Sequence, residues 1–108
     1  MESFAELTER CPSESFEKGQ TLLLKDDIPK SVYVIKSGTV RAYIITPDGA
    51  ERLVALHGPG DDLPVGFGFG LVKSSRYFYE AYSDCRISYV PRKEFEACLR
   101  ADPEAMYE

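Results

Sequence analysis

Apolar and polar residues alternate in three consecutive runs between Val34 and Asp61, and a glycine-containing turn follows each run. Alternation with a period of two is typical of a β-strand that has one face against a core. Glycine accepts the positive φ that tight turns need, and Asp48-Gly49 between two such runs is a strong hairpin signal. The pattern therefore predicts a β-meander with strands near 31–36, 39–46 and 50–57.

The segments on either side extend the β pattern. Two short strands are predicted at 15–17 and 20–24, an aromatic-rich strand at 76–82 and a last strand at 85–90. Both faces of the 31–36 run are apolar, which predicts partial burial on both sides. Short strands separated by turns, with no helix between them, favour an antiparallel sandwich or barrel over a parallel α/β fold.

Helical spacing of apolar residues is confined to the two ends of the chain. It predicts an N-terminal helix within residues 1–12 that covers a sheet edge or end. Pro91 suits the first position of a second amphipathic helix. We therefore expect the 108 residues to form one domain, with a barrel at 14–90 and C-terminal helices at 91–108.

Composition and charge narrow the possible partners. The formal net charge is −5 at pH 7, whereas a protein that grips a phosphate backbone needs a clustered basic face. No apolar run approaches the ~18 residues of a membrane span, and the acidic N-terminus lacks the features of a signal peptide. We therefore expect a cytoplasmic chain that neither enters a membrane nor binds DNA by itself.

Residues with catalytic or metal-binding potential are sparse. Cys11, Cys85 and Cys98 match neither a zinc site nor the four thiolates of an iron–sulfur cluster. We expect reduced thiols, with Cys85 and Cys98 as packing residues, and redox sensing is the alternative. His57 is the one histidine, so it cannot build a multi-histidine metal site, and we expect a strand-end residue with a local hydrogen bond. No catalytic residues and no metal site are predicted.

The segment after Asp61 contains the best candidate for ligand binding. Glycines interrupt its aromatic residues at every second position, which indicates a tight loop with a helical turn rather than a strand. Such a loop can offer backbone N–H groups to an anion, and the aromatic residues that follow could line a pocket. A barrel corner plugged by phenylalanines explains the pattern equally well. The candidate pocket residues are Leu63, Pro64, Val65, Gly66, Phe67, Gly68, Phe69, Ser74, Ser75, Arg76, Tyr77 and Tyr79.

The order of these parts resembles a known family. The stretches FEKGQTLLLKDD, SVYVIKSGTVRAYIITPDGAERLVALHGPGD and YEAYSDCRISYVPRKEFEACL are similar to the cyclic-nucleotide-binding domain of Crp/Fnr transcription regulators. The likeness runs from about Phe16 to Leu99. It implies a mainly β, jelly-roll-like antiparallel barrel, or double-stranded β-helix, with short flanking α-helices. It also implies an effector-sensing, non-enzymatic domain that carries no cofactor and responds to a small molecule.

The resemblance also implies partners outside this stretch. In the family, a long helix after the domain forms the homodimer and leads to a helix-turn-helix that reads DNA. Residues 105–107 look like the beginning of that helix. We therefore expect a truncated or domain-only chain that dimerises weakly or not at all and does not bind DNA.

The chain departs from the family at the nucleotide site. Members that bind cyclic nucleotides carry Gly-Glu-Leu after the Gly-Asp turn and an Arg-Ser or Arg-Thr pair further along. An ungapped alignment puts Pro64-Val65-Gly66 and Ser75-Arg76 at these positions, so both charged contacts are missing. Arg76 could replace the arginine only if a bulge shifted it by one residue. The expected function is thus sensing without the usual binding of cyclic nucleotides.

Three alternatives remain open at this point. The first is a true cAMP or cGMP sensor that uses Arg76. The second is an interaction module whose pocket is filled by its own side chains. The third, less favoured, is a cupin-like enzyme, which would need a bound metal.

Overall fold

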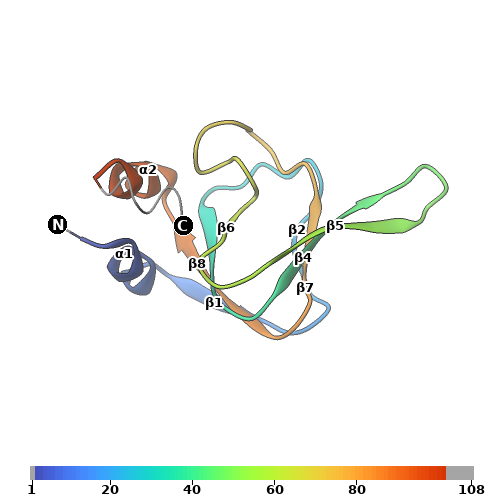
Figure 1. Cartoon of the computed structure of the whole chain (residues 1–108), viewed down its shortest axis with the longest axis horizontal. Coiled ribbons are helices and arrows are strands. Elements are labelled where there is room, and N and C mark those ends of the chain that lie inside the picture. Colours follow the sequence, from blue (N-terminus) through green and yellow to red (C-terminus); the bar gives the residue numbers. More distant parts are fainter. Residues whose placement is uncertain (1, 102–108) are drawn as a thin grey trace.

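The strands form two antiparallel four-stranded sheets that pack against each other in the computed structural model, which describes residues 2–101 (Figure 1). The sheet orders are β1–β8–β3–β6 and β2–β7–β4–β5. This is the mainly β, jelly-roll-like fold predicted, although the two sheets do not close into one barrel within the described part of the chain. The elements are α1 (Phe4–Arg10), β1 (Ser13–Phe16), β2 (Thr21–Leu23), β3 (Val32–Ser37), β4 (Val40–Ile45), β5 (Glu51–His57), β6 (Asp62–Leu63), β7 (Phe78–Ala81), β8 (Cys85–Val90) and α2 (Arg92–Ala101).

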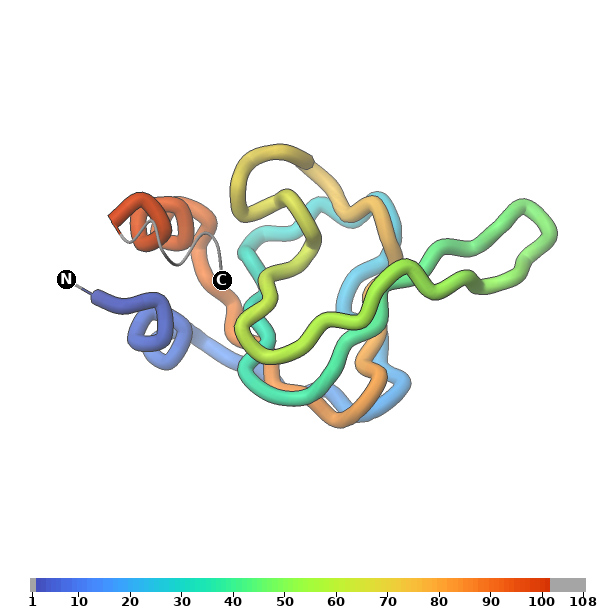
Figure 2. The backbone as a smooth tube through the Cα atoms, viewed as in Figure 1, coloured from blue at the N-terminus to red at the C-terminus, as the bar shows by residue number. Residues whose placement is uncertain are grey.

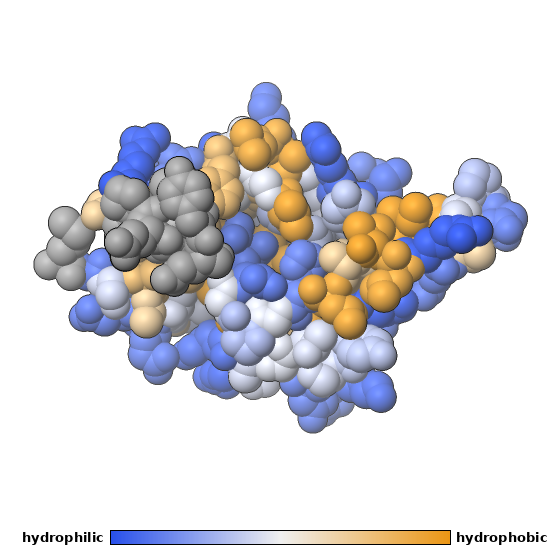
Figure 3. All heavy atoms as spheres, in the orientation of Figure 1, coloured by the Kyte–Doolittle hydropathy of each residue, from blue (hydrophilic) through white to orange (hydrophobic). Residues whose placement is uncertain are grey.

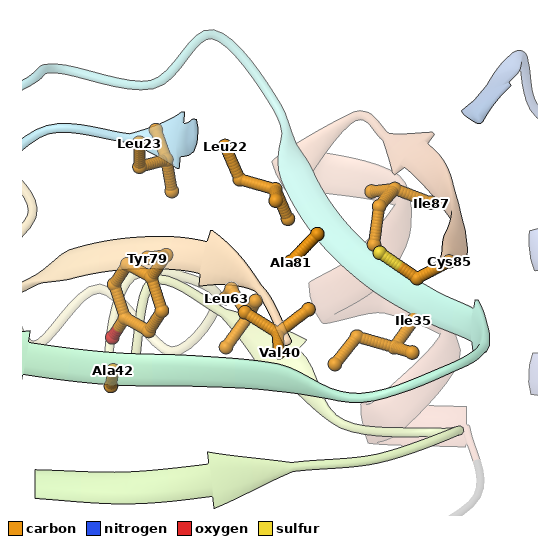
Figure 4. Packing of buried hydrophobic residues seen from close by; sticks show 10 residues of the cluster. All are labelled: Leu22, Leu23, Ile35, Val40, Ala42, Leu63, Tyr79, Ala81, Cys85 and Ile87. Carbon is orange, nitrogen blue, oxygen red and sulfur yellow. The ribbon is translucent and has the colours of Figure 1, made fainter. Parts of the chain in front are cut away.

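The main hydrophobic core lies between the two sheets (Figure 4). Its side chains come from strands of both sheets: Leu22, Leu23, Ile35, Val40, Ala42, Leu63, Tyr79, Ala81, Cys85 and Ile87. Tyr79 is the largest of them and is completely buried. Because each buried Å² of apolar surface stabilises a fold by about 25 cal/mol, this cluster holds the sheets together.

Strand β3 separates this core from a second cluster beneath the helices. Its Ile35 faces the other sheet, whereas Val32 and Val34 pack with residues of both helices. The prediction that both faces of this strand are at least partly buried is therefore confirmed. The second cluster consists of Leu7, Cys11, Val32, Val34, Phe67, Val90, Phe95 and Leu99.

Helices α1 and α2 lie side by side against the first sheet (Figure 1). Ser3 caps the N-terminus of α1 in a capping box with Glu6. The buried Ser88 hydroxyl of β8 donates to the Thr8 carbonyl oxygen at 2.7 Å, which ties α1 to the sheet. Both predicted helices are confirmed, and the further helix expected after residue 101 lies outside the described residues. Neither α1 nor α2 is long and apolar enough to cross a membrane.

One connection contradicts the predicted meander. β4 and β5 form the expected hairpin, but β3 pairs with β8 and β6 instead of β4. The reason lies in the turn after β3, where the Thr39 N–H donates to the Ser83 hydroxyl at 3.0 Å and the Thr39 carbonyl accepts from Tyr82 at 2.9 Å. These bonds direct the chain into the second sheet at Gly38.

Replacing Gly38 with alanine is expected to destabilise the fold more than the same change at Gly49. Both glycines have positive φ, +87° and +89°, so each alanine costs about 1–2 kcal/mol of backbone strain. Only at Gly38 would the new Cβ overlap neighbouring atoms, with the Cys85 Cβ 2.5 Å away, which adds about 1–3 kcal/mol. Urea denaturation measures the free energy of unfolding of both variants. Equal losses of unfolding free energy in the two variants would show that the passage of the chain from one sheet to the other at Gly38 does not depend on this close packing.

Candidate functional site

Residues 64–76 make up all but the last residue of the loop between β6 and β7, and this segment lies beside α2 and the loop that follows β2 (Figure 2). Consecutive turns shape it: the Phe67 N–H donates to Pro64 and the Leu71 N–H donates to Gly66, at 3.0 and 2.9 Å. Gly66 and Gly70 have φ of +86° and +75°, a region that side-chain-bearing residues avoid. The predicted tight loop is therefore confirmed.

The aromatic residues in the first half of the loop pack against α2. Phe67 is buried in the cluster beneath the helices, and the Arg92 guanidinium lies 5.6 Å from its ring centroid. The ring centroids of Phe69 and Phe95 are 5.8 Å apart. Gly68 leaves room for this packing, because a Cβ there would lie 2.8 Å from the Phe95 ring. Packing on α2 thus accounts for Gly68 and the two phenylalanines, whereas positive φ accounts for Gly66 and Gly70.

Tyr79 occupies the space between the sheets below the loop. It is 0% exposed, and its hydroxyl accepts a hydrogen bond from the Val65 N–H at 3.0 Å. Burial raises the pKa of this phenol, and the hydrogen bond from Val65 lowers it in part. Tyr77 meets the Tyr79 ring edge-on, with 6.2 Å between centroids. A backbone N–H that the loop could offer to an anion is therefore bound by the chain's own side chain.

Ser75, at the position aligned with the family's arginine, is buried and fully hydrogen-bonded. Its N–H donates to the Asp27 carbonyl at 2.8 Å, and its own carbonyl accepts from the Asp26 N–H at 2.7 Å. Its hydroxyl donates to the Tyr77 carbonyl at 2.6 Å. Ser75 therefore has no donor left for a phosphate.

Arg76 has the opposite orientation. Its side chain is exposed, and it makes neither a hydrogen bond nor an ion pair with any residue in the range 2–101. Because Ser75 is buried and Arg76 is not, no bulge turns Arg76 inward. The Arg76 side chain is thus exposed to solvent in the loop before β7.

The remaining candidate residues divide between the core and the surface. Leu63 and Pro64 are buried, and Ser74 is half-buried. Val65, Gly66 and Phe69 line a surface depression of about 320 Å³. The residues Ser74, Ser75, Arg76, Tyr77 and Tyr79 do not line that depression.

Three polar residues of this depression were not predicted as site residues: His57, Asp61 and Asp62. Burial raises the pKa of the Asp62 carboxyl. His57 ends β5 as predicted, but its expected hydrogen bond is wrong: Nδ1 lies 3.6 Å from the Asp61 carboxylate, and Nε2 is buried without a partner among the described residues. The sequence signal that could have identified these three residues is their position directly before the glycine-rich loop.

Apolar surface lies over the loop and over the projecting β4–β5 hairpin (Figure 3). The exposed large apolar side chains there are Ile45, Leu53, Val54, Leu56, Val65, Phe69 and Leu71. Exposed apolar patches often mark contact surfaces, and Figure 3 shows one over the loop and one over the hairpin, with polar residues between them. This face therefore suits contact with another protein segment.

The three cysteines are free thiols. Cys11 and Cys85 are buried, and burial raises the pKa of both thiols, which disfavours the reactive thiolate. Cys85 belongs to the inter-sheet core, and Cys98 packs against the cluster beneath the helices. The predicted packing roles of Cys85 and Cys98 are confirmed. Across residues 2–101, no group of three potential metal ligands comes together.

Known proteins are similar to this chain in fold and in part of their sequence. Residues 13–102 match the family model described as the cyclic nucleotide-binding domain. The nitrogen fixation regulation protein FixK of Azorhizobium caulinodans is 33% identical over 89 residues, which are 82% of this chain and 34% of that protein. The fumarate and nitrate reduction regulatory protein of Escherichia coli is 35% identical over 77 residues, 69% of this chain and 29% of that protein. The structure of FixK2 from Bradyrhizobium japonicum is similar with a TM-score of 0.67 and 27% identity, over 90% of this chain and 47% of that chain.

The chain belongs to the cyclic nucleotide-binding domain family, in the form that occurs in Crp/Fnr regulators. It spans about a third of the length of the curated relatives it matches. The resemblance inferred from its turns and strands is therefore confirmed.

Removing the Tyr79 hydroxyl is expected to weaken the attachment of the loop. In Tyr79→Phe, the Val65 N–H loses its acceptor, and an unsatisfied, partly buried donor costs about 1–3 kcal/mol. Tyr77→Phe is the matched control, since the Tyr77 hydroxyl has no hydrogen-bond partner among the described residues. The measurement is the free energy of unfolding in urea. A loss in the control as large as that in Tyr79→Phe would contradict this role of the hydroxyl.

Adding a methyl group at Gly68 is expected to separate the loop from α2. Gly68→Ala places a Cβ 2.8 Å from the Phe95 ring, an overpacking worth about 1–3 kcal/mol. The double variant Gly68→Ala/Phe95→Leu should recover part of that loss in a double-mutant cycle of unfolding free energies. Gly58→Ala, which has open space around the new Cβ, is the control. Additive losses in the cycle would contradict direct packing of the two residues.

Proposed function

We propose that this chain is the effector-sensing domain of a Crp/Fnr-type transcription regulator and that it does not bind cyclic nucleotides in the way usual for the family. The family match supports the first part. The observation that carries the second is the Tyr79 hydroxyl, which accepts the Val65 N–H in the space below the loop. Ser75 supports it further, because its polar groups are all bound within the chain.

The chain lacks much of the binding free energy that other family members gain from a cyclic nucleotide. Val65 and Ser75 stand where binding members carry a carboxylate and a guanidinium, and each charge-assisted hydrogen bond lost is worth about 1.5–3 kcal/mol. A nucleotide that used the Val65 N–H would also have to displace the Tyr79 hydroxyl from it. Because about 1.4 kcal/mol corresponds to a tenfold change in affinity, we expect binding to be weaker by a few orders of magnitude.

We further propose the partners of the whole regulator. It is a homodimer that binds DNA through a helix-turn-helix domain and takes a small-molecule effector in the cytoplasm, and this domain catalyses no reaction. The matching relatives are regulatory proteins, and the exposed apolar surface over the loop and the hairpin supports packing of a further segment or subunit. The net charge of −5 disfavours contact between this domain and DNA. Residues 1–108 act as one sensor domain in this proposal.

Isothermal titration calorimetry tests the nucleotide assignment. Titration of the chain with cAMP and with cGMP is expected to show no binding tighter than about 1 mM. Arg76→Ala should leave the titration unchanged, because the Arg76 side chain is exposed and makes no hydrogen bond or ion pair within residues 2–101. Arg86→Ala, which removes an exposed arginine of β8, is the control. Micromolar binding that disappears in Arg76→Ala and persists in Arg86→Ala would overturn the proposal in favour of a true cyclic-nucleotide sensor.

A further inference from the structure

A second depression, of about 300 Å³, lies between β2, loop 24–31 and the paired residues Tyr33 and Tyr89. Its floor is apolar, because Leu22 and Leu23 belong to the inter-sheet core. The two tyrosines form a wall, with ring centroids 4.9 Å apart in an edge-to-face arrangement. Apolar floors and aromatic walls with a few polar groups are typical of sites for small molecules.

The polar groups of this depression carry opposite charges. Asp27 and Lys30 both line it, and neither forms an ion pair within the described part of the chain. The Asp27 carboxylate is held in place because its Oδ2 accepts the Leu24 N–H at 2.8 Å. The Tyr33 hydroxyl also lacks a hydrogen-bond partner there. An ammonium group near Asp27 and a carboxylate near Lys30 would each gain a charge-assisted bond.

Ile28 adds exposed apolar surface to the same depression. Its side chain is 78% exposed, the largest value among the large apolar residues in the described range, while the neighbouring Pro29 is buried. Covering such a side chain removes apolar surface from water and is favourable. A ligand with an apolar body would therefore gain from contact with Ile28.

The loop that lines this depression is joined to the loop 64–76. The Asp26 N–H donates to the Ser75 carbonyl at 2.7 Å, and the Ser75 N–H donates to the Asp27 carbonyl at 2.8 Å. The two loops run side by side (Figure 2). Asp26 has a φ of +74°, an uncommon conformation for a residue with a side chain. A ligand held by loop 24–31 would therefore restrain Ser75 as well.

We propose that this depression binds a small amphipathic zwitterion, of the kind that an apolar α-amino acid represents. Its ammonium group faces Asp27, its carboxylate faces Lys30, and its apolar body lies between the tyrosine wall and Ile28. The volume is at the lower end of the range for small-ligand pockets, about 300 Å³, which suits a molecule of this size. This assignment does not depend on the function proposed above, and either can fail without the other.

Nuclear magnetic resonance titration tests the ligand class. Probes are L-leucine and L-phenylalanine, with N-acetyl-L-leucine lacking the ammonium and L-leucinamide lacking the carboxylate. We expect saturable shifts of the amide signals of loop 24–31 and Tyr33 with at least one amino acid, and at least about tenfold weaker binding of both leucine derivatives. Amide exchange at Asp26 and Ser75 should slow, while Gly49 in the distant hairpin turn should not change.

Variants of the loop test the charges. Lys30→Met and Asp27→Asn should each weaken binding at least about tenfold, and the asparagine keeps an acceptor for the Leu24 N–H. Lys25→Met is the matched control, since Lys25 is on the same loop but does not line the depression. Spectra that are unchanged outside the loop establish that the variants are folded.

Three results would overturn the proposal. The first is the absence of saturable shifts up to about 10 mM of either amino acid. The second is equal binding of the amino acids and their derivatives. The third is a Lys30→Met variant that binds as tightly as the Lys25→Met control.

Discussion

The hydrogen bond between the Tyr79 hydroxyl and the Val65 N–H connects the core to the loop above it. Tyr79 is completely buried between the sheets and pairs with Leu23 on one side and Ala42 on the other. The Tyr79 hydroxyl is therefore fixed in position, and its hydrogen bond to the Val65 N–H holds Val65 in place. The Tyr79 side chain fills this space and also accepts the Val65 N–H. A ligand that took its place would have to fill the same space and accept the same hydrogen bond.

The loop has two further attachments, one on each side. Gly68 receives the Phe95 ring of α2, and Ser75 exchanges two backbone hydrogen bonds with loop 24–31. The loop is thus braced by β7, which follows it in the chain, and by α2 and loop 24–31, which are not adjacent to it in sequence.

Local patterns predicted the elements well and their partners less well. β8 spans 85–90 as predicted, and the two apolar faces of β3 are both buried. The meander was wrong because a period of two tells which residues share a face and not which strand lies alongside. The crossing at Gly38 depends on hydrogen bonds to the Tyr82-Ser83 turn. That turn lies far along the chain, so no local pattern contains the information.

The sequence by itself determined the fold class and the turn positions, because these follow from residue type and spacing, and its resemblance to the family implies that Val65 and Ser75 replace the carboxylate and the guanidinium. Only the tertiary structure decided that Tyr79 fills the space below the loop and that Arg76 points to solvent. The physical reason is that side-chain direction at the junction of a loop and a strand is set by long-range hydrogen bonds. Here the hydrogen bonds between Ser75 and loop 24–31 keep Ser75 buried and leave Arg76 exposed.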